Sequence, residues 1–428
     1  MNYRETIGYL FSQLPMFQRI GKAAYRDNLD NILALDEAMG HPHRHFKTIH
    51  VAGTNGKGSV SHMLAAILSQ AGCKTGLHTS PHFRDYRERI RINGRMIEKD
   101  FVVAFVREYR LLFDSIKPSF FEMAVAMTFK YFEYQKVDIA VVETGLGGRL
   151  DSTNIITPVL SVITNIGYDH MQFLGDTLEK IAAEKAGIIK ANVPVVVGQT
   201  QAGTIPVFER VAAEKQAPLI IADRKYRVAD SFHTPDRNQL FRVEAPDGKI
   251  MDIVSDLAGL YQKKNVITVL ASVDVLRDAG FSIADNDVVR ALGKVGPLTG
   301  LAGRWQVLGH EPLVVADMAH NRDGLSEVME QVRQTPHKRL HIVFGMVSDK
   351  DDSLVLPLLP SDAIYYFTRA DLPRAMDENV LMERATKSGL KGMAYHRVSD
   401  ALKAARKNAA PGDMVLVTGS AFVVAEII

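Results

Sequence analysis

The chain has 428 residues, of which 46% are hydrophobic and 23% are charged, and its formal net charge is +2. This composition is typical of a globular protein, and the length exceeds what one hydrophobic core usually serves, so we expect two domains. The near-neutral charge and the lack of a strongly basic block argue against a nucleic-acid partner, which leaves small molecules as the expected ligands.

Cysteine content and hydropathy bear on the compartment. Cys73 is the only cysteine, which excludes an internal disulfide and a thiolate metal cluster and favours a reducing compartment. Residues 1–20 mix charged and polar side chains with apolar ones, so they lack the unbroken apolar core of a signal peptide. No apolar run approaches the length of a membrane span. We therefore expect a cytoplasmic protein without a membrane partner, acting as a monomer.

The first predicted elements lead to a glycine-rich turn. A helix is expected over 26–39, ended by Gly40 and Pro42, and is followed by a strand at 48–52. The strand runs into Gly53-Thr54-Asn55-Gly56-Lys57-Gly58-Ser59, and residues 59–71 have apolar positions at helical spacing. Such glycines let several backbone N–H groups point at one anion, and the positive end of the next helix faces the same point.

This turn therefore predicts a phosphate site, in which Lys57 reaches the outer phosphates and the Ser59 hydroxyl binds Mg²⁺. The strict P-loop pattern fails, because Val51 occupies the first glycine position and Gly58 separates Lys57 from Ser59. An ordinary glycine-rich turn is the alternative. The joint presence of strand, lysine, hydroxyl and helix favours phosphate binding.

Further strands and helices alternate along the first half of the chain. They are a strand at 74–79, a hairpin signalled by Asn93-Gly94, helices near 101–113 and 122–134, strands at 137–142 and 159–164, a helix at 177–189 and a strand at 193–197. Alternation of this kind implies right-handed βαβ units in an open parallel sheet, whose ligands bind beyond the carboxyl ends of the strands. Gly53–Ser59, Ser80, Glu143 and His170 all follow strands, so we expect them to meet at one site.

Two of these strand-end residues are candidate metal ligands. Glu143 offers a carboxylate where a hard cation bridging phosphates would need one, although a charged residue at a strand end can simply meet solvent. His170 is weaker by itself, since most histidines bind no metal, but its place at a strand end favours a role in the site.

Lys185 shares a helical stripe with Ile181 and Ala182, which directs its amine toward packed surface. Burial would lower its pKa and yield a neutral, nucleophilic amine. The alternative is a lysine that extends to solvent or pairs with Glu184, and spacing alone favours that alternative.

In the second half of the chain the pattern of alternating strands and helices is interrupted and then resumes. Alternating residues over 226–254 predict a small antiparallel insertion, and a helix is expected from about Asn265 to Ala279. The Gly- and Pro-rich stretch 293–303 is the best candidate linker. Beyond it, buried strands alternate with helices again, which indicates a second, smaller doubly wound domain. We place the domains at 1–296 and 297–428.

Polar residues near the first strand of the second domain suggest a second set of nucleotide contacts. Arg304 lies near the domain junction, where it can bridge phosphates, and Asp317 follows a strand, where an acid can bind ribose hydroxyls. His320 lies three residues further on. Taken singly, each of these residue types is more often found on the surface. Because all three lie at a strand end or at the domain junction, together they support a nucleotide site.

Several ordered motifs resemble one known family. They are His50–Ser59, Thr79-Ser80-Pro81-His82, Glu143–Asn154, Ile163–His170 and Ile181–Ile188. Together they resemble the folylpolyglutamate synthase and dihydrofolate synthase family of the Mur ligase superfamily, nearly end to end. The resemblance implies an α/β fold, with a parallel-sheet P-loop ATPase domain followed by a smaller Rossmann-like domain, and an ATP-dependent ligase that adds L-glutamate to dihydropteroate or folates through an acyl phosphate.

The resemblance also implies roles for individual residues. Thr54 to Ser59 would hold the phosphates of ATP, Ser59, Ser80, Glu143 and His170 would bind Mg²⁺, and Lys185 would carry a carbamate. Asn265, Arg304 and Asp317 match nucleotide contacts, and His320 matches a residue near the transferred phosphate. The pteroate-binding positions would be Thr79, Phe121, Glu122, Leu150, Asp151 and Ser152.

Two departures from the family pattern lie near the expected nucleotide. Leu301-Ala302 stands where the family usually has Trp-Pro, and Met318 stands where it usually has Gly. We expect a bifunctional enzyme; the alternatives are a monofunctional folylpolyglutamate synthase or another Mur-type ligase, such as a cell-wall ligase. Two readings from other classes are a P-loop motor or switch protein and a nucleotide-binding regulator without chemistry.

Overall fold

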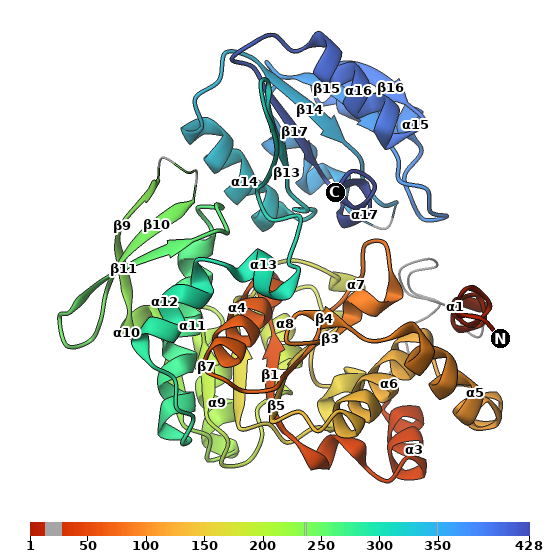
Figure 1. Ribbon diagram of the computed structural model, residues 1–428. Helices are drawn as coiled ribbons and strands as arrows, with labels where there is room; N and C mark the ends of the chain where they lie inside the picture. The colour runs from red at the N-terminus through yellow and green to blue at the C-terminus, as the bar shows by residue number, and fades with distance from the viewer. Residues whose placement is uncertain (13–27, 235, 237, 349) are drawn as a thin grey trace. The chain divides into compact units, whose positions relative to one another are not determined.

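The computed structural model describes residues 1–12, 28–234, 236, 238–348 and 350–428. These residues divide into two compact units (Figure 1). The larger unit runs as far as Asp256 and continues from Gln262 to Leu301, and the second contains Leu257–Tyr261 and Ala302–Ile428. The chain therefore leaves the larger unit briefly at Leu257–Tyr261, an excursion that no change of composition signals.

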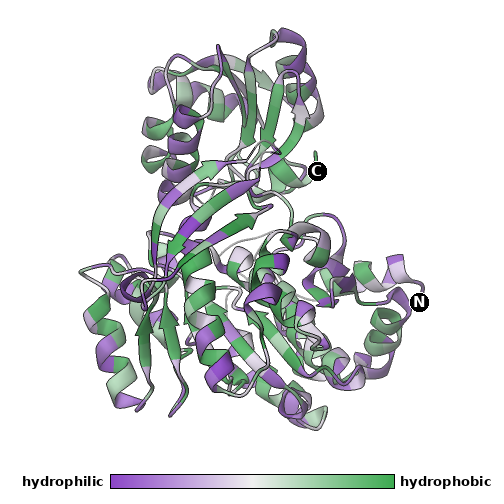
Figure 2. Cartoon of the chain, turned by 60° about the vertical axis from the view of Figure 1, so that its left-hand side comes forward, coloured by the Kyte–Doolittle hydropathy of each residue, from purple (hydrophilic) through white to green (hydrophobic). Residues whose placement is uncertain are grey.

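The larger unit is built on an eight-stranded sheet with the order β4-β3-β2-β5-β1-β6-β7-β8. Its strands are β1 (Lys47–Ala52), β2 (Thr75–His78), β3 (Ile90–Ile92), β4 (Arg95–Met96), β5 (Ile139–Glu143), β6 (Leu160–Ile163), β7 (Val195–Val197) and β8 (Leu219–Ile221). The strands from β2 to β8 in this order run parallel, whereas β3 pairs antiparallel with β2 and β4 pairs antiparallel with β3. The central strands are buried on both faces, which explains their continuous apolar sequences (Figure 2).

Helices cover both faces of this sheet. On one face lie α4 (Lys57–Gln70) and α11 (Gln262–Asp278); on the other lie α6 (Phe120–Tyr134), α8 (Leu178–Ala186) and α9 (Ile205–Glu214). The remaining helices of this unit are α1 (Tyr3–Ser12), α3 (Asp30–Ala38), α5 (Lys99–Ile116), α7 (Met171–Leu174), α10 (Ala222–Lys225), α12 (Asp285–Leu292), α13 (Val295–Thr299), η2 (Pro42–His45), η3 (Tyr86–Arg89) and η4 (Ser152–Ile155). None of the helices in the described parts of the chain is long and apolar enough to cross a membrane.

Most predicted elements are present with boundaries shifted by a few residues. The helix predicted over 26–39 begins at Asp30, after Leu29 at its N-cap, and ends at Ala38; residues 26 and 27 lie outside the described residues. The predicted hairpin is confirmed: Asn93 and Gly94 both have positive φ, 45° and 77°, as its two-residue turn requires. Just before the hairpin, residues Tyr86–Arg89 form a 3₁₀ turn, and the Asp85 carboxylate caps this turn by accepting from the Arg87 N–H.

Two predictions for residues 226–303 meet different outcomes. The alternating segment forms a three-stranded antiparallel sheet of β9 (Arg227–His233), β10 (Gln239–Glu244) and β11 (Ile250–Ser255), drawn in green in Figure 1. Most of the stretch predicted as a linker belongs instead to the larger unit, since it contains α13. The Asp256 carboxylate stabilises the start of that helix by accepting from the Val295 and Gly296 N–H groups, at 2.9 and 2.8 Å.

The second unit has a six-stranded sheet with the order β12-β13-β17-β14-β15-β16. Its elements are β12 (Gln306–His310), β13 (Leu313–Ala316), β14 (Leu340–Phe344), β15 (Ile364–Thr368), β16 (Lys391–Tyr395), β17 (Met414–Thr418), α14 (Arg322–Gln334), α15 (Glu378–Lys387), α16 (Val398–Asn408), α17 (Ala421–Ala425), η5 (Asp352–Leu354) and η6 (Leu356–Leu358). All strands except β12 run parallel. The predicted fold class, a parallel-sheet α/β domain followed by a smaller one, is confirmed.

Candidate functional site

The glycine-rich turn lies at the carboxyl end of β1 and opens directly into α4. Gly56, with φ of 86°, takes a left-handed conformation that lets the chain turn into the helix at Lys57. The loop after β6 holds the turn in place: the Thr54 N–H donates to the Asn165 carbonyl at 2.9 Å, and the Asn55 N–H donates to Asn165 Oδ1 at 2.9 Å. The predicted strand-end convergence is thus present for the loops after β1 and β6.

Two lysines meet on one carbonyl oxygen beneath this turn. Lys57 Nζ donates to the Gly53 carbonyl at 3.1 Å, and Lys185 Nζ donates to the same oxygen at 2.9 Å. Neither lysine makes an ion pair with another described residue within 4.0 Å. Burial and, to a smaller extent, the charge of Lys57 lower the pKa of Lys185 to about 7. The site therefore concentrates positive charge and holds one amine that is readily neutral.

The prediction from the helical stripe is confirmed for the direction of Lys185, whose side chain is 4% exposed. The alternative that spacing alone favoured is wrong. Glu184 accepts instead from Arg149, at 2.9 Å from Nη2, so it is not the partner of the Lys185 amine. Spacing could not reveal this, because Arg149 comes from a distant loop.

Ser80 and Glu143 lie next to each other at the ends of β2 and β5. The Ser80 N–H donates to Glu143 Oε2 at 3.3 Å, and the Glu143 side chain is 4% exposed. His170, in a left-handed conformation with φ of 51°, follows the β6 loop, and its Nε2 lies 3.8 Å from Asp169 Oδ1. Ser59 lies in the first turn of α4, where its buried hydroxyl accepts from Gln262 Nε2 at 3.2 Å.

This donor set suits Mg²⁺ held together with phosphate oxygens. Among the described residues no cluster of three or more His, Cys, Asp or Glu side chains could hold a metal by itself. One carboxylate, two hydroxyls and one imidazole are too few for a closed protein cage. Mg²⁺ ordinarily keeps waters and binds through one or two carboxylates plus substrate phosphates, so the residues fit that ion.

The predicted pteroate-binding residues occupy three places near this edge. Thr79 follows β2, and its N–H donates to the Arg89 carbonyl at 3.1 Å. The Phe121 ring packs against Gly145, whose Cα leaves no room for a Cβ beside the ring. Glu122 has a local role: it forms a capping box with Ser119 at the start of α6.

The remaining three form the turn between β5 and η4. Leu150 is half-buried, Ser152 begins η4, and Asp151 caps that turn. The buried Asp151 carboxylate accepts from the Leu146 N–H at 2.7 Å and from Thr153 Oγ1 at 2.6 Å, and burial raises its pKa. Thr153 Oγ1 in turn lies 2.8 Å from Nε2 of the buried His50. Asp151 therefore fixes the shape of its own loop.

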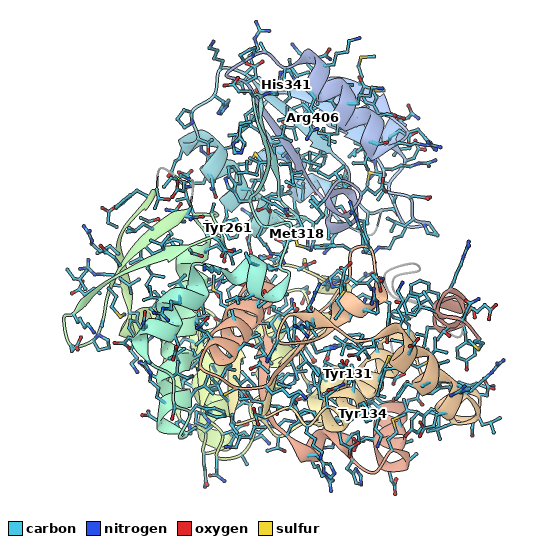
Figure 3. All side chains as sticks on the ribbon, viewed as in Figure 1. Tyr131, Tyr134, Tyr261, Met318, His341 and Arg406 are labelled. Carbon is cyan, nitrogen blue, oxygen red and sulfur yellow. The ribbon has the colours of Figure 1, made fainter. Side chains whose placement is uncertain are left out.

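In the second unit, the Asp317 carboxylate accepts three hydrogen bonds. Its Oδ2 accepts from the Tyr261 hydroxyl at 2.6 Å and the Trp305 N–H at 2.8 Å, and its Oδ1 accepts from the Ala319 N–H at 2.9 Å. Burial raises the pKa of the carboxyl. Figure 3 labels Tyr261, which donates to this carboxylate, and Met318, which follows it in sequence.

The other two predicted residues of the second unit lie close by in sequence. Arg304 is half-buried, and its Nη1 donates to the Gly303 carbonyl at 3.4 Å. His320 Nδ1 lies 3.0 Å from the Met318 carbonyl oxygen, so Nδ1 is the nitrogen that donates to it. The Arg304 charge acts on Asp317 by lowering its pKa against the effect of burial.

Three buried or half-buried residues at these edges escaped the sequence analysis. Arg89 is 1% exposed, donates from Nε to His82 Nδ1 at 2.8 Å, and leaves Nη1 without a hydrogen-bond partner among the described residues. Gln262 and Tyr261 had no motif, although Gln262 lies one helical turn before Asn265, a spacing that could have drawn attention to it.

Comparison with known proteins covers nearly all of the chain. The Mur ligase middle domain matches residues 51–273, and the Mur ligase glutamate ligase domain matches residues 303–421. The chain is 32% identical over 416 residues to the dihydrofolate synthase/folylpolyglutamate synthase of Bacillus subtilis, covering 95% of each protein. It is 34% identical over 435 residues to a probable bifunctional folylpolyglutamate synthase/dihydropteroate synthase of Haloferax volcanii, covering 100% of this chain and half, 50%, of that longer protein.

A solved structure agrees with these matches. Escherichia coli FolC in complex with DHPP and ADP superposes on this chain with a TM-score of 0.85 at 27% identity, covering 100% of this chain and 97% of that one. The similarity therefore extends over both units and both edges described above.

Proposed function

Because the chain belongs to the folylpolyglutamate synthase/dihydrofolate synthase family of Mur ligases, we propose that it joins L-glutamate to the carboxylate of a pteroate or folate. It is an ATP-dependent carboxylate–amine ligase. The observation that carries the proposal is the phosphate turn with two lysines on the Gly53 carbonyl, inside a full-length match to curated ligases.

The chemistry has two steps. A carboxylate resists attack by an amine because oxide is a poor leaving group, so a carboxylate oxygen first attacks the γ-phosphorus of ATP and ADP leaves. The glutamate nitrogen then attacks the carbonyl carbon of the acyl phosphate, the bond from carbon to the phosphate oxygen breaks, and the nitrogen loses a proton to solvent. Catalysis of such phosphoryl transfer is mainly positioning and neutralisation of charge.

The phosphate turn supplies both. The N–H groups of Gly56 to Ser59 would bind the phosphates, whereas those of Thr54 and Asn55 donate to Asn165 and hold the turn in shape. Lys57 would place its charge on the transferred group. Ser59, Ser80, Glu143 and His170 would hold Mg²⁺, which when bound neutralises phosphate charge. The contact from the Ser80 N–H to Glu143 supports this set, because it aligns two of the four ligands before any ion arrives.

We propose further that Lys185 carries a carbamate in the working enzyme. Its pKa of about 7 leaves much of the amine neutral near neutral pH, and the neutral amine is the form that attacks CO₂. The new N–C bond replaces a cation by an anion and releases a proton. An anion is the sign that suits a neighbouring Mg²⁺.

The proposed nucleotide and acceptor sites use the remaining residues. Asn265, Arg304 and Asp317 would contact ATP, and His320 would lie near the transferred phosphate. The pteroate would meet Thr79, Phe121, Glu122, Leu150, Asp151 and Ser152. In this assignment Glu122 and Asp151 act mainly by shaping the wall, because their carboxylates already hold a helix start and a loop.

We propose that one site performs both ligations, the first glutamate onto dihydropteroate and further glutamates onto folates, and that the enzyme works as a cytoplasmic monomer. The test is incubation with ATP, Mg²⁺, glutamate and either dihydropteroate or tetrahydrofolate, with products identified by mass. Glutamylation of both acceptors is expected. Glutamylation of tetrahydrofolate alone would show that the protein is a monofunctional folylpolyglutamate synthase.

Controls in the same assay separate the other classes. A nucleotide-linked muropeptide should not react, and its ligation would indicate a cell-wall enzyme. ATP turnover that needs neither carboxylate nor amine would indicate a motor or switch protein. Sedimentation velocity would check the monomer.

A further inference from the structure

A buried carboxamide, that of Gln262, contacts a residue of the proposed phosphate site. Gln262, the first residue of α11, is fully buried. Its Nε2 donates to Ser59 Oγ at 3.2 Å, and its Oε1 accepts from Asn265 Nδ2 at 2.7 Å. Both ends of the carboxamide therefore have a partner, one of which lies in the first turn of α4.

The hydrogen bond has a consequence for the Ser59 hydroxyl. A serine oxygen has one hydrogen and two lone pairs. The bond from Gln262 occupies one lone pair, which leaves the second lone pair for a cation and the hydrogen for a phosphate oxygen. The buried hydroxyl has no freedom to turn toward water, so this arrangement presents it to both partners at once.

Asn265 supports the same loop one turn further along α11. A Cβ built on Gly56 would lie 2.3 Å from Asn265 Oδ1, so the second carboxamide rests directly on the backbone of the turn. The two carboxamides, joined to each other, thus hold the turn at Gly56 and the helix start at Ser59.

We infer that Gln262 is a positioning residue for the Mg²⁺ and phosphate site: it fixes the Ser59 hydroxyl in the orientation that binds the metal–nucleotide complex. The inference rests on the proposed function, because it takes Ser59 as a ligand. Gln262 itself touches no substrate, so it acts only through Ser59 and Asn265.

The test is binding of a non-hydrolysable ATP analogue, measured by titration calorimetry with Mg²⁺ and again with EDTA. Gln262→Met keeps a side chain of similar length and removes the donor. We expect it to weaken binding with Mg²⁺ by about five- to tenfold, the worth of one hydrogen bond, and to leave binding with EDTA within about twofold. Ser272→Ala is the matched control, since it removes a buried hydrogen bond within the same helix, from Ser272 Oγ to the Thr268 carbonyl, and should change neither value.

A double-mutant cycle separates positioning from packing. In a Ser59→Ala background Gln262→Met should have no further effect on the Mg²⁺-dependent part of binding. An equal loss in both backgrounds, or no loss in the single variant, would overturn the inference. Gln262→Asn, whose shorter side chain cannot reach Ser59, should behave like Gln262→Met and serves if the latter unfolds.

The outcome for the proposed function is distinct. A wild-type protein that binds no nucleotide and ligates no glutamate would refute the function as a whole. A wild type that ligates glutamate, with Gln262 variants that bind Mg²⁺–nucleotide normally, would refute only the role of Gln262.

Discussion

The carboxyl edges of the two parallel sheets carry charge in opposite ways. At the edge of the larger unit, Lys57 and Lys185 share the Gly53 carbonyl and have no ion-pair partner among the described residues. At the edge of the second unit, Asp317 accepts from Tyr261, Trp305 and Ala319 within its own unit. Within the described parts of the chain, the two amines of the first edge are held only by backbone carbonyls, whereas the carboxylate of the second edge accepts three hydrogen bonds from its own unit.

This difference predicts at which edge a substitution should change activity alone and at which edge it should change both activity and stability. A fully or partly buried cation without an ion-pair partner costs stability, so its removal should harm activity but not the fold. A buried carboxylate that satisfies three donors supports the fold, so its removal should harm both.

The largest effect is expected for Lys57→Ala. Loss of the charge at the phosphates should lower ligation by about a hundredfold or more, while the midpoint of thermal unfolding stays the same or rises. Steady-state kinetics and a thermal melt check both parts. Lys180→Ala, which removes an exposed lysine paired with Asp176, is the control and should retain activity. A folded Lys57→Ala variant with normal turnover would contradict the claim that the charge at the first edge serves activity.

Glu143→Ala should come next, with a loss of about a hundredfold at the Mg²⁺ concentration that is optimal for the wild type. The carboxylate lies beside the Ser80 N–H and is the only acid in the proposed ligand set. Titration of activity with Mg²⁺ checks the assignment. A wild-type rate at that concentration would show that Glu143 is not a ligand.

Asp317→Ala sharpens the second half of the comparison. It leaves the buried Tyr261 hydroxyl and two backbone N–H groups without their acceptor, which should lower the free energy of unfolding of the second unit by roughly 3 kcal/mol or more. Trp305 is the only tryptophan and its N–H bonds Asp317, so denaturant unfolding followed by tryptophan fluorescence reports on this unit. An unchanged midpoint would mean that the carboxylate serves the ligand alone.

Sequence reasoning reached the first edge more fully than the second. Gly53–Ser59 and Glu143 follow apolar strands, so their position after parallel strands was enough to predict that they lie at the same edge of the sheet. The helical stripe directed Lys185 inward, but spacing could not show that Glu184 binds Arg149. Tyr261 and Gln262 were missed because their contacts with Asp317 and Ser59 join segments distant in sequence, for which periodicity gives no signal. Arg89 was missed although its contact, His82, is only seven residues away, because the sequence pattern does not show that its side chain is buried.

The smallest effect concerns Lys185 and pH. Because its pKa is lowered to about 7, the neutral amine predominates above that pH and the ammonium below it. Enzyme stripped of CO₂ should therefore regain activity with bicarbonate one unit above this pKa, and several-fold less one unit below. Lys185→Ala should lose activity and recover part of it with short carboxylates. Full activity in Lys185→Ala without any supplement would show that the lysine only packs.

The same shift has a stability counterpart. In CO₂-free buffer the buried ammonium should cost stability fully below about pH 7, and the cost should fall as the pH rises from there toward the ordinary lysine value. The stability gained by Lys185→Met over the wild type should therefore shrink with rising pH. A gain that does not vary with pH would contradict the lowered pKa.

The central claim, that the charged edge activates a carboxylate with ATP, is tested most directly by following an oxygen atom. The enzyme is supplied with ATP, Mg²⁺, glutamate and dihydropteroate whose carboxylate carries heavy oxygen, and the released phosphate is analysed by mass spectrometry. If an acyl phosphate forms, one labelled oxygen passes from the carboxylate to the phosphate and the other stays in the new amide. Unlabelled phosphate from a reaction that still makes the glutamyl product would contradict the account.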